Sequence, residues 1–178
     1  GFVALDERVI HEGPVFTVSI GQVRAPDGEL LTREYVRHPG AVMVVTVIDW
    51  KVVMVRQYRA AIDQPLLEIP AGKRDVAGEA PELTARRELR EEVGLEAGEL
   101  VLLSSFFNTP GFSDESSYCF LAPVCVEVGS DLQGAEEQHM TVERIPLAQA
   151  VEMAVTGEVT DAKTIIGLLL AERALTGG

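Results

Sequence analysis

Three glutamates on one predicted helix are the residues of this chain best suited to chemistry. Glu88, Glu91 and Glu92 stand at positions i, i+3 and i+4, so a helix directs their carboxylates toward one face. Like charges held so close repel each other, and a bound cation would relieve that repulsion. Hard oxygen ligands at this spacing suit Mg²⁺ or Mn²⁺. The alternative is a solvated acidic face offset by the arginines of the same segment, and the spacing alone leaves both interpretations open.

The helix that carries these glutamates is predicted to run from about Pro81 to Val93. Proline is favoured at the first helical position, and Gly94 supplies the signal for the helix to end. Ala85, Leu89 and Val93 form an apolar stripe beside the carboxylates. This stripe predicts that the helix docks on a sheet.

Two valine-rich runs, residues 41–48 and 51–58, predict the core strands of that sheet. Their continuous apolar character indicates burial on both faces, and a short polar turn at residues 49–51 joins them. Upstream, the turn signal at residues 26–28 predicts a hairpin from Val15 to Val36. Residues 66–80 are predicted to combine a short strand with a glycine-containing loop. Further strands are predicted at Leu100–Phe107, Tyr118–Val128 and Met140–Ile145, and closing helices at Leu147–Thr156 and Asp161–Leu175, the last capped by Thr160 or Asp161.

Composition limits the classes of function. With 178 residues and 47 % hydrophobic content, the chain is long enough for one domain with a full core. Its formal charge of -13 would repel a nucleic acid, and no apolar run reaches the roughly 20 residues of a membrane span. The N-terminal stretch lacks the layout of a signal peptide. We therefore expect a soluble cytoplasmic protein that binds neither nucleic acid nor membranes.

The two cysteines are predicted to be unpaired. Cys119 and Cys125 lie six residues apart in one predicted strand, which separates them by roughly 20 Å. A disulfide tolerates only about 7 Å between Cα atoms. We expect buried apolar side chains, in agreement with a reducing compartment.

The segment around the glutamates resembles the Nudix box, G-x5-E-x7-R-E-U-x-E-E-x-G-U, in which U is aliphatic. Gly72, Glu79 and the run from Arg87 to Leu95 match every fixed residue. The one departure is that six residues, and not five, separate Gly72 from Glu79. This insertion leaves the helical residues in register. The resemblance implies an α/β protein with the Nudix fold, an α/β/α sandwich with a mixed sheet, in which residues 38–178 form the catalytic domain and residues 1–37 an N-terminal antiparallel hairpin region.

The same resemblance implies a metal site that uses Mg²⁺, with Mn²⁺ as the other possibility. Glu88 and Glu92 are the expected ligands, Glu91 binds directly or through water, and the backbone carbonyl of Ala71 completes the site. Arg87 is expected to bond to Glu79 and to orient the acidic cluster. Metal ions there polarise a phosphoryl oxygen and prepare a water for attack on phosphorus.

Features outside the box are similar to the ADP-ribose pyrophosphatase subfamily. Pro110 follows Leu95 by fifteen residues, as does a proline that marks those enzymes. Ser113 and Glu115, in the segment after Pro110, are expected to bond to the terminal ribose or assist at the metal. The alternative is that this segment is simply a turn.

Two arginines and a glutamate near the core strands are further substrate-binding candidates. Arg56 and Arg59 suit a diphosphate because a guanidinium can bond to two oxygens at once. Glu68 is expected to bind adenine or its ribose. Structural salt bridges are the alternative for all three residues.

The N-terminal region is expected to take part in dimerisation. In related ADP-ribose hydrolases these strands exchange between the subunits of a homodimer, and aromatic and arginine residues of one subunit help to hold the adenine in the other. Phe16 and Arg33 are the candidates for that role. A hairpin that does not cover itself fits such an exchange.

The catalytic base is expected on the acidic loop that covers residues 134–139. Glu136 is the first candidate and Glu137 the second, with closure of the loop over the substrate. An ordinary solvated acidic loop is the alternative. Gln138 stands where some relatives carry a further carboxylate ligand, so the number of metal ions is left open.

The sequence thus predicts hydrolysis of the diphosphate bond of ADP-ribose to AMP and ribose 5-phosphate. The alternative within the same chemistry is a hydrolase of other nucleoside diphosphate sugars such as GDP-mannose. A non-catalytic nucleotide-sensing Nudix module is the alternative of another class, and the intact box glutamates argue against it. A triphosphatase for oxidised nucleotides is disfavoured by the N-terminal hairpin and by Pro110.

Overall fold

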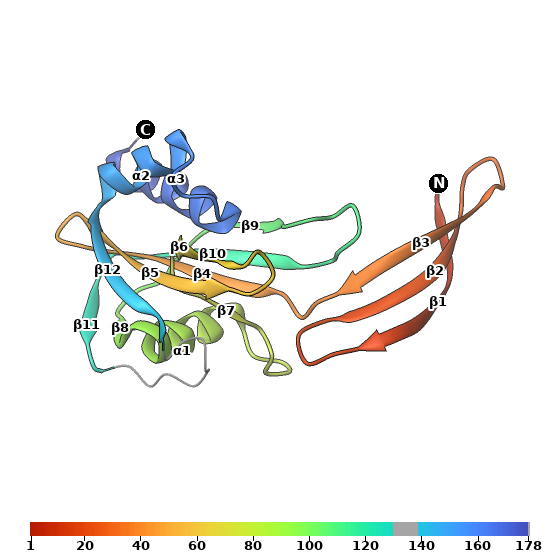
Figure 1. The fold of residues 1–178 in the computed structure, drawn as a ribbon, viewed down its shortest axis with the longest axis horizontal. Coiled ribbons are helices and arrows are strands. Elements are labelled where there is room, and N and C mark those ends of the chain that lie inside the picture. Colours follow the sequence, from red (N-terminus) through yellow and green to blue (C-terminus); the bar gives the residue numbers. More distant parts are fainter. Residues whose placement is uncertain (130–138, 178) are drawn as a thin grey trace. The chain divides into compact units, whose positions relative to one another are not determined.

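The computed structural model describes residues 1–129 and 139–177. The chain divides into two compact units, one made of Gly1–Gly40 with Phe106–Ser116 and the other of Ala41–Ser105 with Ser117–Gly178. Each unit is described by itself below. Figure 1 shows the elements of both in the colours of the sequence.

The first unit is built on a three-stranded antiparallel sheet. Its strands pair in the order β1-β2-β3. The predicted hairpin of β2 and β3 is confirmed, and a turn at residues 25–28 with Gly28 at φ 93 joins the two strands. The edge strand β3 contacts the Phe106–Ser116 segment, since the N–H of Val36 donates to the carbonyl of Phe112 at 2.8 Å. The bounds are β1 (Val3–Glu12), β2 (Thr17–Arg24) and β3 (Leu30–Arg37).

An ion-paired cluster ties together the parts of this unit. Arg37 donates to both carboxylate oxygens of Glu7 at 2.8 and 2.5 Å and to Asp114 at 3.2 Å. The Ser19 hydroxyl donates to Glu7 as well, at 2.5 Å. The hydrogen bonds from Arg37 and then from Ser19 lower the pKa of Glu7 to about 2. Glu7 is therefore ionised throughout the ordinary pH range.

The second unit is built on a mixed sheet whose strand order is β12-β5-β4-β10-β9, with β6 paired to β5 and β7 to β4. β10 runs parallel to β4, whereas β5 and β7 are antiparallel to it. β8 and β11 pair in a separate two-stranded sheet. The bounds are β4 (Ala41–Ile48), β5 (Lys51–Arg59), β6 (Gln64–Glu68), β7 (Ala71–Lys73), β8 (Leu95–Ala97), β9 (Val101–Phe107), β10 (Ser116–Ala122), β11 (Cys125–Glu127) and β12 (Thr141–Pro146).

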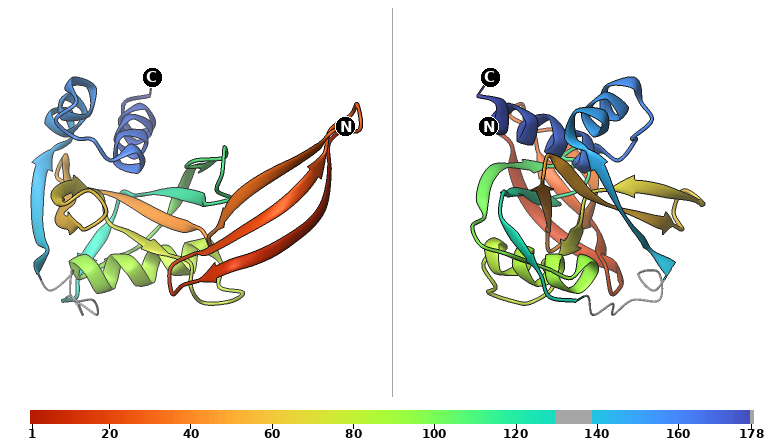
Figure 2. Two further views of the ribbon diagram at one scale, coloured as in Figure 1. Left: turned by 45° about the vertical axis from the view of Figure 1, so that its right-hand side comes forward. Right: turned by 90° about the vertical axis from the view of Figure 1, so that its left-hand side faces the viewer.

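Helices cover both faces of the mixed sheet, as Figure 2 shows for α1 on one side and α2 and α3 on the other. Successive side chains of a strand point to opposite faces, so β4 supplies both layers of the core. Val42 and Val44 pack with Ala85 and Leu89 of α1, while Val45 approaches α3 at Gly167. The predicted α/β/α sandwich is thus confirmed. The helices are α1 (Pro81–Val93), α2 (Leu147–Thr156) and α3 (Ala162–Thr176).

Local signals account for the ends of these elements. Asp49 and Trp50 both have positive φ, at 50° and 59°, which gives the tight turn between β4 and β5. α2 ends at Gly157 in the left-handed conformation, and α3 is capped by Asp161, whose carboxylate accepts from the N–H of Thr164. Asp161 is therefore the cap, one of the two residues predicted.

The N-terminal strand β1 was not predicted from the sequence. All ten of its residues are exposed, so burial imposes no alternation of apolar and polar residues on it. β8, which is three residues long, was missed as well.

The prediction of a single strand over Tyr118–Val128 was wrong. β10 ends at Ala122, because Pro123 has no N–H to continue a ladder, and β11 then pairs with β8 in the other sheet. Cys119 and Cys125 therefore lie in different strands, and both are free thiols as predicted. Cys119 is buried as expected, whereas Cys125 is only partly buried. Burial raises the pKa of Cys119 to about 12, which keeps that thiol protonated.

The helices of residues 1–129 and 139–177 include none that is long and apolar enough to cross a membrane.

Candidate active site

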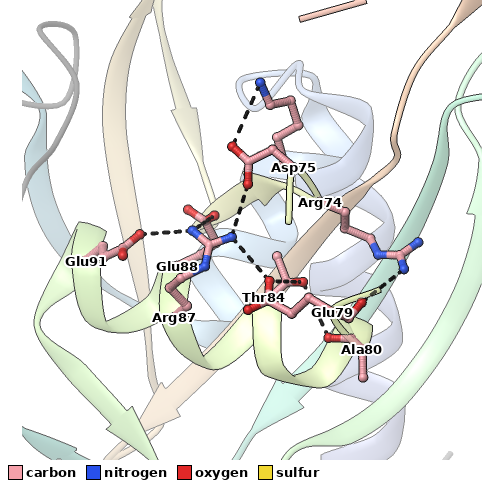
Figure 3. Close-up of polar contacts among 9 residues, drawn as sticks. Arg74, Asp75, Glu79, Ala80, Thr84, Arg87, Glu88 and Glu91 are labelled. Carbon is pink, nitrogen blue, oxygen red and sulfur yellow. Dashed lines mark hydrogen bonds and ion pairs between the residues drawn. The ribbon is translucent and has the colours of Figure 1, made fainter. Parts of the chain in front are cut away.

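Helix α1 carries the glutamates predicted to bind a metal. Pro81 stands in its first turn, and Gly94 ends it in the left-handed conformation at φ 66. Ala85 and Leu89 are completely buried in the core, which fixes the rotation of the helix against the sheet. The carboxylate of Glu88 thereby lies against β7 (Figure 3).

Glu88 occupies the space that a side chain at residue 72 would need. A Cβ on Gly72 would lie 1.9 Å from Cδ of Glu88, so only glycine permits this contact. Burial raises the pKa of Glu88 to about 7, because lost hydration and the charge of Glu91 outweigh the attraction of Arg87. The ionised form of this carboxyl is therefore destabilised in its surroundings.

Glu92 is the most buried of the three glutamates, with 5 % of its surface exposed. Its Oε2 accepts a hydrogen bond of 3.1 Å from the N–H of Ala71. This bond connects α1 directly to the first residue of β7. It places Glu92 beside the backbone that was predicted to supply a carbonyl ligand.

Arg87 contacts four carboxylates at once (Figure 3). Its Nη1 donates to Glu88 at 2.8 Å and to Glu91 at 3.2 Å, whereas its Nη2 lies 3.4 Å from both Asp75 and Glu79. Burial of the guanidinium lowers its pKa, but the charges of Glu88, Glu79 and Glu91 outweigh burial, and the pKa is raised overall. Arg87 therefore supplies positive charge to the centre of the acidic cluster.

Two partners in this network were not found from the sequence. The predicted contact of Arg87 with Glu79 is present, but Asp75 joins it, and the Thr84 hydroxyl donates to Glu79 at 2.8 Å. Asp75 lies within the stretch of six residues between Gly72 and Glu79. The sequence of that stretch shows no periodicity that would indicate which of its side chains turns back toward α1.

The donor chemistry of this cluster suits a hard divalent cation. Within residues 1–129 and 139–177, no three His, Cys, Asp or Glu side chains lie close enough together to hold a metal ion as they stand. Two carboxylates nevertheless lie against β7, the buried Glu92 and the partly buried Glu88, where Gly72 leaves room for oxygen ligands. Glu88 is also destabilised as an anion, which a cation would reverse. The residues present therefore fit a metal of the Mg²⁺ class.

The candidate residues for the diphosphate are engaged in ion pairs. Arg59 makes two hydrogen bonds with Glu68, at 2.7 and 2.6 Å, and only 1 % of Glu68 is exposed. The hydrogen bonding with Glu68 raises the pKa of Arg59 although burial lowers it, and the charges of Glu68, Asp161 and Glu92 raise it further. Arg56 pairs with Glu143 at 2.7 Å on the surface. Salt bridging, the alternative for these residues, is thus present in the structure.

The remaining substrate-binding candidates belong to the first unit. Pro110 lines a surface hollow of about 280 Å³ together with the aromatic rings of Tyr35, Phe107 and Phe112. Ser113 is buried, and its hydroxyl accepts from the N–H of Glu115 at 3.2 Å. The three aromatic residues were not singled out from the sequence.

Phe16 lies in the connection between β1 and β2 and Arg33 in β3, and both are exposed. Arg33 donates to the backbone carbonyl of Thr32 at 2.8 Å. The candidates for the catalytic base, Glu136 and Glu137, lie outside the described residues, as does Gln138.

Comparison with known proteins assigns the family. The family model described as the NUDIX domain matches residues 36–166. The chain belongs to the Nudix family.

Relatives within this family are similar over nearly the whole chain. An ADP-ribose pyrophosphatase of Mycobacterium tuberculosis is 42 % identical over 177 residues, which cover 99 % of this chain and 86 % of that protein. An ADP-ribose pyrophosphatase of Bacillus subtilis is 39 % identical and covers 87 % of this chain and 84 % of its own length. A crystal structure described as an ADP compounds hydrolase shares the Nudix fold, with a TM-score of 0.84 at 24 % identity over 99 % of this chain and 95 % of that one.

The Nudix box occupies one continuous stretch of this structure. It begins at Gly72 in β7, passes through the loop with the additional residue, follows α1 and ends at Leu95 in β8. The additional residue lies before Pro81, so it alters the loop and leaves the helix unchanged. Each fixed glutamate therefore keeps its place on the helix.

The contact of Gly72 with Glu88 generates a stability prediction. Gly72→Ala is expected to lower the free energy of unfolding by about 1–3 kcal/mol, because the added Cβ overlaps the Glu88 carboxyl. In a Glu88→Ala background the same change should cost at least about 1 kcal/mol less. Urea unfolding of the two single variants and the double variant measures this coupling.

Gly98→Ala is the control, because a Cβ there meets its nearest atom, the carbonyl oxygen of Val124, at an ordinary 3.6 Å. It should change stability by no more than about 0.5 kcal/mol. An equal cost of Gly72→Ala with and without the Glu88 side chain would contradict the assigned contact.

Proposed function

We propose that this Nudix protein hydrolyses the diphosphate bond of ADP-ribose, giving AMP and ribose 5-phosphate. The observation that carries the proposal is the complete carboxylate set of the box, held by α1 beside Ala71 and Gly72 of β7. The relatives named as ADP-ribose pyrophosphatases support this substrate. In the reaction one water adds across the P–O–P bridge, so that each phosphorus leaves as a phosphate monoester.

Divalent metal ions are generally used by Nudix hydrolases, and we propose Mg²⁺ for this one, with Mn²⁺ as a substitute. The residues that would hold the ion are Glu88, Glu91, Glu92 and the carbonyl of Ala71. A bound ion supplies positive charge to the phosphoryl oxygens and acidifies a coordinated water. The site thereby compensates for the net charge of -13, which would otherwise repel an anionic substrate.

The protein's own groups arrange the carboxylates for this task. Arg87 holds Glu88 and Glu91 through a single nitrogen, at 2.8 and 3.2 Å, and so keeps both oxygens on the same side of the helix. Glu92 is held from the other direction by the Ala71 N–H. Glu136, or else Glu137, is proposed on sequence grounds as the base that takes the proton of the attacking water.

Arg56 and Arg59 are proposed to bind the diphosphate, and their present partners suggest different roles. The exposed pair of Arg56 with Glu143 contributes no more than about 1 kcal/mol, so a doubly charged ligand can displace it. The pair of Arg59 with buried Glu68 is costly to break, because a buried carboxylate would lose its partner. Arg56 is therefore the more available donor, and Arg59 is better suited to holding Glu68 toward adenine or its ribose.

In the first unit, Pro110, Ser113 and Glu115 are proposed to serve the terminal ribose or the metal, and Phe16 and Arg33 the adenine. The aromatic lining of the hollow at Pro110 supports contact with a flat ring or a sugar face. We propose the cytoplasm as the compartment of the enzyme, because Cys119 and Cys125 are both free thiols.

We further propose that the enzyme is a homodimer that exchanges the strands of residues 1–37. β1 supports this proposal, because all of its residues are exposed and they include large apolar side chains. Such a strand in water invites pairing with a second copy. The apolar exposed residues of this region are Phe2, Val3, Leu5, Val9, Ile10, Val15, Phe16 and Leu30.

The substrate proposal is tested by steady-state hydrolysis of ADP-ribose, GDP-mannose, UDP-glucose, NADH and a nucleoside triphosphate. We expect ADP-ribose to have the highest kcat/KM by about tenfold or more, since a site that pairs with a substrate's polar groups discriminates against analogues. Chelation of the metal should stop turnover. Preference for GDP-mannose would retain Nudix chemistry but refute the adenine-binding residues, and no turnover of any compound would indicate the sensing module.

Glu92→Gln tests the metal site. The amide oxygen can still accept from the Ala71 N–H, so the fold should persist, whereas loss of the charge should lower metal-dependent kcat/KM by about 100-fold or more. Glu99→Gln removes an exposed carboxylate close to the end of the box and serves as the control. Near-native turnover by the Glu92 variant would refute its role as a ligand.

Sedimentation velocity tests the dimer. The chain should sediment as a dimer, and Val9→Glu should shift it to the monomer, because an unpaired carboxylate would be buried at the exchanged strand. Val155→Glu, on an exposed position of α2, is the matched control and should leave the dimer intact. A monomeric native chain, or a Val9 variant that still sediments as a dimer, would rule out the exchange.

A further inference from the structure

A buried hydrogen-bond relay connects the start of α3 to the link between β6 and β7. The N–H of Ile69 donates to Oγ1 of Thr164 at 3.0 Å, across 95 residues of sequence. The Thr164 hydroxyl in turn donates to Oδ2 of Asp161 at 2.7 Å. Thr164 is completely buried, so this relay is shielded from water.

The relay has a defined direction. An ionised carboxylate only accepts hydrogen bonds, so Asp161 makes the Thr164 hydroxyl point its proton away from Ile69 and present a lone pair to the Ile69 N–H. Lys163 bonds to the other oxygen of Asp161 at 2.7 Å, and the N–H of Thr164 donates to Oδ2 at 2.8 Å. These contacts hold the carboxylate in place.

The segment that receives this bond leads directly into the proposed metal site. Pro70 follows Ile69, and its carbonyl accepts from the N–H of Val44 at 2.9 Å. Ala71 comes next, and its N–H donates to Glu92 at 3.1 Å. Each residue from Ile69 to Ala71 thus has one backbone group tied to a different element, namely α3, β4 and α1.

A shift of the Ile69 backbone would also shift the Ala71 backbone. The ring of Pro70 restricts φ to about −65°, so the residue between them cannot absorb a change in that angle. Side-chain packing holds the same segment, because a Cβ at Gly167 of α3 would lie only 2.7 Å from Cδ1 of Ile69. The beginning of α3 therefore has both a polar and an apolar contact with Ile69.

We propose that Thr164 and Asp161 are positioning residues for the metal site, acting through the Ile69 N–H on the Ala71 carbonyl and on the Ala71–Glu92 hydrogen bond. The inference rests on the proposed metal site of Ala71, Glu88, Glu91 and Glu92. It assigns to the C-terminal helix a role in metal affinity, although that helix supplies no ligand to the site.

The test measures Mn²⁺ binding to the full chain, by the loss of the free Mn²⁺ signal in electron paramagnetic resonance, in parallel with melting temperature. Thr164→Val keeps the shape of the side chain but removes the acceptor of the Ile69 N–H. We expect about tenfold weaker Mn²⁺ binding, as is usual when a group that supports a ligand is lost. Thr164→Ser should restore native affinity, because it returns the hydroxyl.

Leu168→Ala is the matched control, since Leu168 is fully buried on the same helix and makes no hydrogen bond to Ile69 through its side chain. It should lower the melting temperature at least as much as Thr164→Val and leave Mn²⁺ affinity unchanged. If Thr164→Val does not fold, Asp161→Asn takes its place. The amide can still cap α3 but accepts more weakly from the Thr164 hydroxyl, so a smaller loss of affinity in the same direction is expected.

Native Mn²⁺ affinity in a folded Thr164→Val, or in Asp161→Asn, would overturn the positioning role and leave the relay a stabilising contact only. Equal losses of affinity in Thr164→Val and Leu168→Ala would also overturn it, since they would reflect general loosening. A parent chain that binds no Mn²⁺ at all would instead refute the metal site itself, and the inference with it.

Discussion

Burial of negative charge is the constraint on which the rest of this site depends. Glu88 and Glu92 lie against β7 with little contact with water, and an unpaired carboxylate in such a place would be strongly destabilised. Two devices reduce that cost, namely the guanidinium of Arg87 and the N–H of Ala71. The missing side chain of Gly72 leaves the room that the Glu88 carboxylate occupies. The raised pKa of Glu88, about 7, shows that these devices compensate incompletely. A carboxyl left in this condition gains more from a cation than a solvated one does.

The sandwich architecture brings these devices together from distant parts of the chain. β4 faces α1 through Val42 and Val44 and faces α3 through Val45, because consecutive residues of a strand alternate between the two sides. β7 pairs with the same strand, so the backbone at Ala71 is supported by β4 and reached by α1. The preceding segment is reached by α3 at Ile69. The sheet and the helices on its two faces therefore each make a contact with the backbone of residues 69–71. Through this backbone α3, which supplies no ligand, can influence the site.

The arginines illustrate how the same residue type serves different ends within one unit. Arg59 neutralises the buried carboxylate of Glu68, and Arg87 lies among carboxylates that are for the most part partly buried. The pKa of each of these two arginines is raised by its partners. Arg56 pairs on the surface, where water and salt weaken the attraction. An acidic chain that acts on an anionic substrate must use its few available cations selectively. An arginine in a solvent-exposed ion pair can exchange its partner for a ligand, whereas an arginine paired with a buried carboxylate stabilises the fold.

The sequence alone determined the parts of this protein that depend on short-range periodicity: the limits of α1, the spacing of Glu88, Glu91 and Glu92, and the two core strands. It narrowed the cap of α3 to Thr160 or Asp161, and the structure selects Asp161. Those features follow from hydrogen bonds and apolar contacts within a few residues. The tertiary structure decided the partners of Arg87 in the loop, the pairing of β11 with β8, the exposed strand β1 and the bond between Ile69 and Thr164. No local pattern encodes these, because each depends on which surfaces meet when segments far apart in the sequence pack together, and a side chain that gains its partner across 95 residues leaves no periodic trace near its own position.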